Sequence, residues 1–78
     1  MALRIEFTVE PFQDGAPGPH VRAAVDAAHA AGMTVDFGPF GSSVEGEDDR
    51  VLEAADAVVR AAIGAGASRV SLQVTRPH

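Results

Sequence analysis

Two strand–helix–strand patterns follow one another along the chain, and this repetition limits the possible folds more than any other feature. Apolar and polar side chains alternate over residues 3–10, as in a strand with one buried face. Pro19 suits the first position of a helix, and Gly32 is expected to end that helix. The alternation from Met33 to Phe37 predicts a second strand, which completes the first pattern.

The second pattern begins after the glycine-rich centre of the chain. Residues 42–45 predict a short third strand, and the acids of residues 47–49 favour a helix start because the helix dipole stabilises negative charge there. Gly64 and Gly66 are expected to end this helix, and residues 70–75 predict a last strand. The helix carries a broad apolar stripe: Val51, Leu52, Ala55, Val58, Val59, Ala62 and Ile63.

The order strand, helix, strand, strand, helix, strand predicts an α+β fold. Two right-handed crossovers then give a ferredoxin-like βαββαβ sandwich, with a four-stranded antiparallel sheet and both helices on one face. The face under the helices should collect Leu3, Ile5, Phe7, Val9, Met33, Val35, Phe37, Val44, Val70, Leu72 and Val74. The opposite face should be polar, with Glu6, Thr8, Asp36, Ser43, Glu45, Ser71, Gln73 and Thr75.

Length and charge restrict the class of protein. The 78 residues predict one domain over residues 1–78, and a core this small is marginal by itself. The chain has no cysteine for a disulfide, so we expect it to gain stability by association with other subunits. A net charge of −5, with no basic patch, argues against nucleic acid as a partner. No signal peptide or long apolar run is evident, so we expect a cytoplasmic protein without membrane contact.

A pair of carboxylates and one Ser-His-Asp combination are the candidate catalytic groups. Glu6 and Glu45 are expected on neighbouring strands of the same face, where two close carboxylates split their pKa values, although a solvated strand face explains them more simply. A relay of Ser42, His29 and Asp36 lacks any local nucleophile motif. Catalysis is therefore not expected.

Metal binding is not expected either. His20 and His29 do not have the spacing of a helical metal site, and surface positions account for them. The acids between Glu45 and Asp49 lack the alternating ligands of a calcium loop.

The central segment from Gly38 to Gly46 offers backbone N–H groups and two adjacent serine hydroxyls beside a carboxylate. Such chemistry suits a small polar ligand, although a plain hairpin connection would use the same residues. Phe12 and Phe40 each follow a proline just beyond a strand end. Their rings could complete the core edge, pack on another subunit or stack on a flat ligand.

Three segments together resemble the YkoF-like family of small thiamine-binding proteins. These are Glu6-Phe7-Thr8-Val9-Glu10-Pro11, the segment from Gly38 to Gly46, and Gly66-Ala67-Ser68-Arg69-Val70. The likeness extends over nearly the whole chain, with Ser42 where the family usually has threonine and Phe40 where methionine is frequent.

The resemblance implies a ferredoxin-like homodimer or homotetramer that binds thiamine or its hydroxymethylpyrimidine moiety, without established catalysis. We expect no cofactor and no metal. The ligand-binding residues that it and the local chemistry suggest are Pro11, Phe12, Asp36, Phe40, Gly41, Ser42, Ser43 and Glu45. Two other hypotheses stay open: a structural or regulatory interaction module without a ligand, and a small hydrolase or isomerase using Glu6, Asp36 or Glu45.

Overall fold

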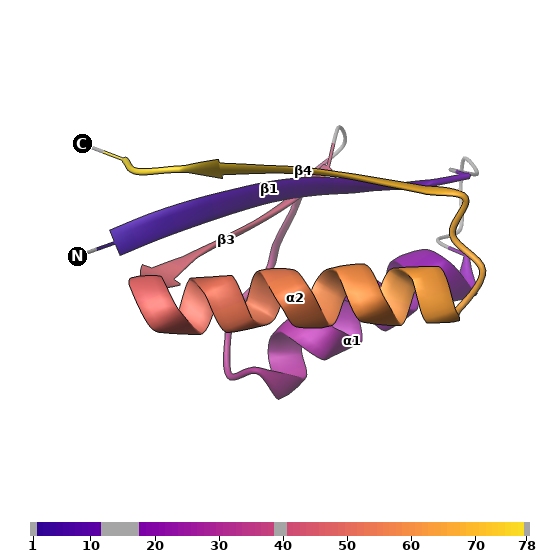
Figure 1. Ribbon diagram of the computed structural model, residues 1–78, viewed down its shortest axis with the longest axis horizontal. Coiled ribbons are helices and arrows are strands. Elements are labelled where there is room, and N and C mark those ends of the chain that lie inside the picture. The colour runs from indigo at the N-terminus through magenta and orange to yellow at the C-terminus, as the bar shows by residue number, and fades with distance from the viewer. Residues whose placement is uncertain (1, 12–17, 39–40, 78) are drawn as a thin grey trace.

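The computed structural model describes residues 2–11, 18–38 and 41–77. The elements follow in the order β1 (Ala2–Glu10), α1 (Pro19–Ala30), β2 (Asp36–Gly38), β3 (Gly41–Glu47), α2 (Asp48–Gly64) and β4 (Arg69–Thr75). Figure 1 shows two layers, with the sheet above and both helices below it. The predicted α+β architecture with both helices on one face is therefore confirmed.

The sheet has the strand order β2-β3-β1-β4, and every neighbouring pair is antiparallel. Three long strands form most of it, with β1 in the centre, while β2 adds only a three-residue edge beside β3. The chain crosses the sheet twice through a helix, as the sequence pattern predicts. The centre of β1 therefore has a strand on each side, and its exposed face lies in the middle of the sheet.

The core lies between the sheet and the helices. Strand β1 contributes every second residue to it, and α2 contributes residues at helical spacing. Its buried members are Leu3, Ile5, Phe7, Val9, Val21, Ala24, Ala28, Met33, Val44, Val51, Ala54, Val58 and Ala62. Both helices contribute small buried alanines, and α1 packs directly against α2.

Both helices end in the same glycine motif. Gly32 has φ +82°, and its N–H and that of Met33 donate to the carbonyls of His29 and Ala28. Gly66, with φ +103°, repeats this arrangement after α2. These are Schellman caps, in which a residue of positive φ lets the last carbonyls of the helix find donors. The glycine signals at 32 and 66 are confirmed, while Gly64 is the last residue of α2 itself.

The cap at the end of α1 explains why one predicted strand boundary was wrong. A strand was expected from Met33 to Phe37, but β2 covers Asp36–Gly38. Because the N–H of Met33 bonds to the end of α1, this residue closes the helix and its side chain is buried in the core. Strand β3, by contrast, is longer than its predicted span of residues 42–45.

The predicted core positions were wrong at one flank of the molecule. The side chains of Leu52, Val59, Ile63 and Val74 are 50%, 38%, 53% and 46% exposed. The helical stripe is wider than the surface that the small sheet can cover, so only its centre is buried. Val74 lies opposite the buried Ile5 in the register but on the edge strand, beyond the cover of the helix.

An ion pair joins the start of α2 to the segment that follows β4. Arg76 donates to both carboxylate oxygens of Asp48, at 3.2 and 3.1 Å, and to the carbonyl of Ala2. The hydrogen bond from Arg76 holds the pKa of the Asp48 carboxyl below its ordinary value of 3.8. A depressed folded-state pKa means that the stabilisation is complete above pH 3.8 and is lost as the pH falls through the folded-state pKa.

We therefore expect Arg76→Gln to lower the melting temperature at neutral pH and to differ progressively less from the wild type below pH 3.8. Thermal unfolding followed by circular dichroism across pH 2 to 7 measures this difference. Arg60→Gln is the control, because Arg60 pairs with Asp56 only within one helix and both side chains are more exposed. A difference in melting temperature between Arg76→Gln and the wild type that does not change with pH would contradict the expectation.

Candidate functional site

The polar face of the sheet, opposite the helices, carries the candidate site. Strand register arranges its side chains in cross-strand rows. One row crosses the whole sheet, since Asp36 of β2 pairs with Ser43, Ser43 with Glu6, and Glu6 with Gln73 of β4. Directly paired residues point to the same side of a sheet, so these four side chains share one surface.

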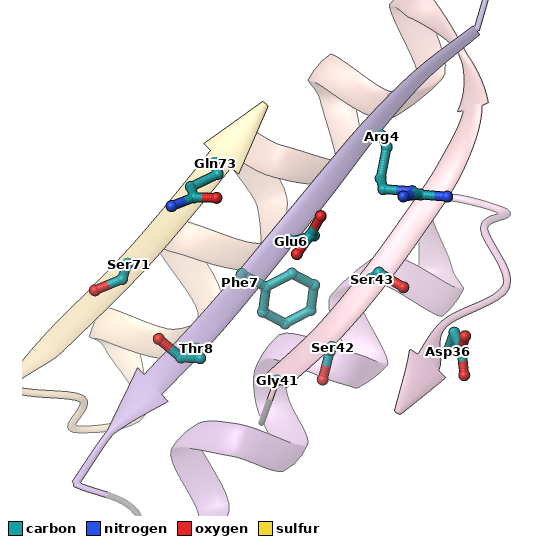
Figure 2. A pocket seen from close by; sticks show the side chains of 10 residues that line it. All are labelled: Arg4, Glu6, Phe7, Thr8, Asp36, Gly41, Ser42, Ser43, Ser71 and Gln73. Carbon is teal, nitrogen blue, oxygen red and sulfur yellow. The ribbon is translucent and has the colours of Figure 1, made fainter. Parts of the chain in front are cut away.

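A hollow of about 560 Å³ lies over this row. Its volume falls within the roughly 300–1,000 Å³ of small-molecule pockets. Ten residues line it: Arg4, Glu6, Phe7, Thr8, Asp36, Gly41, Ser42, Ser43, Ser71 and Gln73. Figure 2 shows that they come from all four strands, with Glu6 near the middle. Carboxylates, hydroxyls and one amide dominate, so the hollow suits a hydrophilic ligand with several hydrogen-bonding groups.

The charges of the hollow favour a cation. Arg4 donates from Nε and Nη2 to Glu45 Oε2, at 3.2 and 3.0 Å, so its charge is compensated. Glu6 and Asp36 have no ion-pair partner among the described residues. Their two carboxylates are therefore available to a positively charged group or to N–H donors of a ligand.

Gly41 keeps the rim of the hollow open. Its φ is +155°, and a Cβ at this position would lie 3.1 Å from both the Phe7 carbonyl oxygen and the Thr8 Cγ2. A larger residue would have to displace the backbone of the central strand. The glycine thus allows β3 to begin close against β1, beside the polar row.

The structure brings four of the eight predicted site residues to this hollow: Asp36, Gly41, Ser42 and Ser43. The two serines differ, however. Ser42 pairs with Phe7 and is 6% exposed, so its side chain belongs to the core side of β3. Ser43 is the hydroxyl of the polar row. The alternation of a strand separates these adjacent serines onto opposite faces.

The other four predicted residues are placed differently or not described. Glu45 does not line the hollow but holds Arg4, which does. Pro11 follows β1, and its carbonyl is hydrogen-bonded to Nε2 of His20. His20 is itself buried, so its expected surface position was wrong. Phe12 and Phe40 lie outside the described residues.

Sequence reasoning missed Arg4 and Phe7 as lining residues, and it placed Thr8, Ser71 and Gln73 on the polar face without assigning them to a site. The period of two identifies which residues share a face but not which strands lie next to one another. The expected placement of Glu6 and Glu45 on neighbouring strands of the same face is confirmed, although the two residues do not pair directly. Glu6 pairs with Ser43, and Glu45 pairs with Arg4 two residues away along β1.

Within residues 2–11, 18–38 and 41–77, no group of three or more His, Asp or Glu side chains is arranged to hold a metal ion. Over the same ranges, neither helix is long and apolar enough to cross a membrane.

Fold and hollow together define a small α+β protein with an acidic, hydroxyl-lined hollow on the open face of its sheet. The profile of the thiamine-binding protein family matches residues 5–76, and the chain belongs to this family. The resemblance noted from the sequence is thereby confirmed. No curated protein matches the chain.

Solved structures share the fold. A domain of unknown function from Bacillus cereus is 23% identical, with a TM-score of 0.69 over 95% of this chain and 72% of that one. A hypothetical protein from Methanocaldococcus jannascii is 21% identical, with a TM-score of 0.72 over 99% and 81%. A candidate thiamine biosynthesis or salvage protein from Thermotoga maritima is 22% identical, with a TM-score of 0.68 over 96% and 81%.

Proposed function

We propose that this protein reversibly binds thiamine, or its hydroxymethylpyrimidine moiety, on the polar face of the sheet and works as a non-catalytic carrier. Membership of the thiamine-binding family supports the ligand class. The observation that carries the proposal is the pair of carboxylates, Glu6 and Asp36, in a hollow large enough for a small molecule.

The chemistry of thiamine matches this row of side chains. Its thiazolium ring is a permanent cation, and its aminopyrimidine ring offers an amino group and ring nitrogens. A carboxylate of Glu6 or Asp36 can face the cation or accept from the amino group. The Ser43 hydroxyl and the Gln73 amide, which flank Glu6 in the register, can donate to the ring nitrogens.

Calorimetric titration of the purified protein with thiamine and, separately, with hydroxymethylpyrimidine tests the proposal. We expect saturable heat with thiamine and a rise in melting temperature, since a ligand that binds only the folded state stabilises it. Binding of both molecules would place the main contacts on the pyrimidine, whereas binding of thiamine alone would place them on the thiazolium. A folded sample that shows neither heat nor a thermal shift with either molecule would refute the proposal and favour the interaction-module alternative.

The Arg4–Glu45 pair gives a second expectation about the same site. Glu45→Gln should weaken thiamine binding by up to roughly fivefold, because it leaves the positive charge of Arg4 uncompensated at the hollow, and exposed ionic interactions contribute ~0.2–1 kcal/mol. Calorimetry on this variant measures the loss.

Arg4→Gln combined with Glu45→Gln is the control that separates an indirect role from a direct one. If Glu45 acts only by compensating Arg4, the double variant should regain the affinity of the wild type. A double variant as weak as Glu45→Gln alone would mean that Glu45 itself contacts the ligand.

A further inference from the structure

The positive charges on the polar face of the sheet are paired with glutamates. Among the described strands, two arginines lie on this face, Arg4 of β1 and Arg69 of β4. Arg4 Nη2 lies 3.0 Å from Glu45 Oε2 on the neighbouring β3. Arg69 Nε lies 3.7 Å from Oε2 of Glu10, the residue opposite it on β1. Each arginine is thus compensated by a carboxylate on the next strand.

The row between these two ion pairs holds two carboxylates and no cation. Glu6 and Asp36 belong to this row, and the hollow extends from the row of Arg4 through it to the row of Thr8. Successive rows on one face of a sheet are about 7 Å apart along the strands, since every second residue faces the same way. Any group inside the hollow therefore lies at most about one row away from these carboxylates.

The hollow also lacks the groups with which proteins usually hold a phosphate. Such sites use lysine, unpaired arginine or the N-terminus of a helix. The chain contains no lysine, and Arg4, the one cation among the described lining residues, is paired with Glu45. All described lining residues belong to strands, and both helices cover the opposite face of the sheet (Figure 1). A phosphate would find only neutral side-chain donors there.

Thiamine and its phosphate esters differ mainly in charge. Thiamine carries one positive charge on its thiazolium ring and ends in an uncharged alcohol. Esterification of this alcohol adds a phosphate of about −1.5 to −2 at neutral pH, so the ester is an anion overall although both rings are unchanged. The charges of the hollow therefore distinguish the two forms.

We propose that the hollow holds the unphosphorylated alcohol and rejects its phosphate esters, and that Glu45 sets this selectivity by neutralising Arg4. The inference rests on the proposed function and adds to it the form in which the ligand is bound. Glu45 is a positioning residue, because it acts through the guanidinium that it holds. With Arg4 paired, an ester phosphate meets Glu6 and Asp36 without a cation. An unpaired Arg4 can instead bind a phosphate through two parallel hydrogen bonds.

Calorimetric titration of the whole protein with thiamine and with thiamine monophosphate measures the selectivity. We expect the monophosphate to bind at least about fivefold more weakly, because two carboxylates oppose its phosphate, each with the strength of an exposed ionic interaction. The ratio of the two dissociation constants should become smaller in 1 M salt, where the Debye length is only about 3 Å. A ratio that salt leaves unchanged would mean exclusion by size, contrary to the inference.

Glu45→Gln tests the role of the ion pair. The ratio should fall roughly tenfold in this variant, because the freed Arg4 repels the thiazolium ring and donates to the phosphate. Adding Arg4→Gln should restore the ratio of the wild type, since it removes the freed charge. Both side chains are about half exposed, so circular dichroism should show an intact fold.

Glu10→Gln is the matched control. It removes the same charge and frees Arg69 on the same face of the sheet, but neither residue lines the hollow. This variant should keep the ratio of the wild type. An equal fall of the ratio in Glu10→Gln and Glu45→Gln would mean that only net charge matters, which overturns the role assigned to Glu45.

The remaining outcomes separate this inference from the proposed function. A folded wild type that does not bind thiamine refutes both. Binding of thiamine together with equal or tighter binding of the monophosphate leaves the proposed function intact and overturns the selectivity. A ratio that Glu45→Gln does not change, or that Arg4→Gln does not restore in the double variant, overturns the role of the Arg4–Glu45 pair.

Discussion

Thiamine should bind at least tenfold more weakly to a protein carrying both Glu6→Gln and Asp36→Asn. Each change keeps the size of the side chain and removes one negative charge from the hollow. Hydrogen bonds to charged groups contribute about 1.5–3 kcal/mol. A factor of ten in the dissociation constant corresponds to about 1.4 kcal/mol, so even one such contact is enough for the expected loss. Calorimetric titration of the variant measures it.

The control for this variant carries the same change in net charge on the other side of the molecule. Glu53→Gln with Asp26→Asn removes two exposed carboxylates from the helices, outside the hollow. This protein should bind thiamine as the wild type does. Equal weakening of both variants would mean that only the overall negative charge attracts the ligand. Unchanged affinity of the first variant would exclude Glu6 and Asp36 as ligand contacts.

Replacement of Ile5 by alanine should destabilise the fold by about 2–5 kcal/mol. Ile5 is fully buried on the central strand, opposite Val44 on one side and Val74 on the other. For a domain of this size each kcal/mol lowers the melting temperature by about 4–8 °C. A loss of about 3 kcal/mol would therefore shift it by roughly 12–24 °C, as measured by thermal unfolding.

Ile5→Val is the matched control, because it removes one methylene group at the same position. Its expected cost is about 0.5–1.5 kcal/mol, between the wild type and the alanine variant. A loss with alanine no larger than with valine would show that the neighbouring side chains close over the space. The core would then be less tightly packed than the burial of Ile5 indicates.

Local patterns were sufficient for the elements and their order. Alternation over residues 3–10 predicted β1, and glycines 32 and 66 predicted both helix ends, because these signals act within a few residues of chain. They were insufficient at Met33, whose N–H bonds to the end of α1. His20 was misplaced for a related reason, since its partner, the Pro11 carbonyl, lies in another part of the chain.

Half of the predicted ligand-binding residues could likewise be identified from local sequence patterns. The segment from Asp36 to Ser43 carries turn chemistry and polar side chains that are visible in a short window. Arg4 and Gln73 lie far away in sequence and reach the hollow only through strand pairing. The role of Glu45 as the partner of Arg4 also depends on that pairing.

The amino-acid sequence by itself determined the α+β pattern, the polar and apolar faces of each strand, and membership of the thiamine-binding family. Only the tertiary structure decided which polar residues stand together, with Glu6 between Ser43 and Gln73, and which apolar side chains of α2 and β4 remain exposed. The physical reason is that side-chain direction repeats every two or 3.6 residues and is local. Strand register and the extent of helix cover depend instead on contacts between residues far apart in the chain.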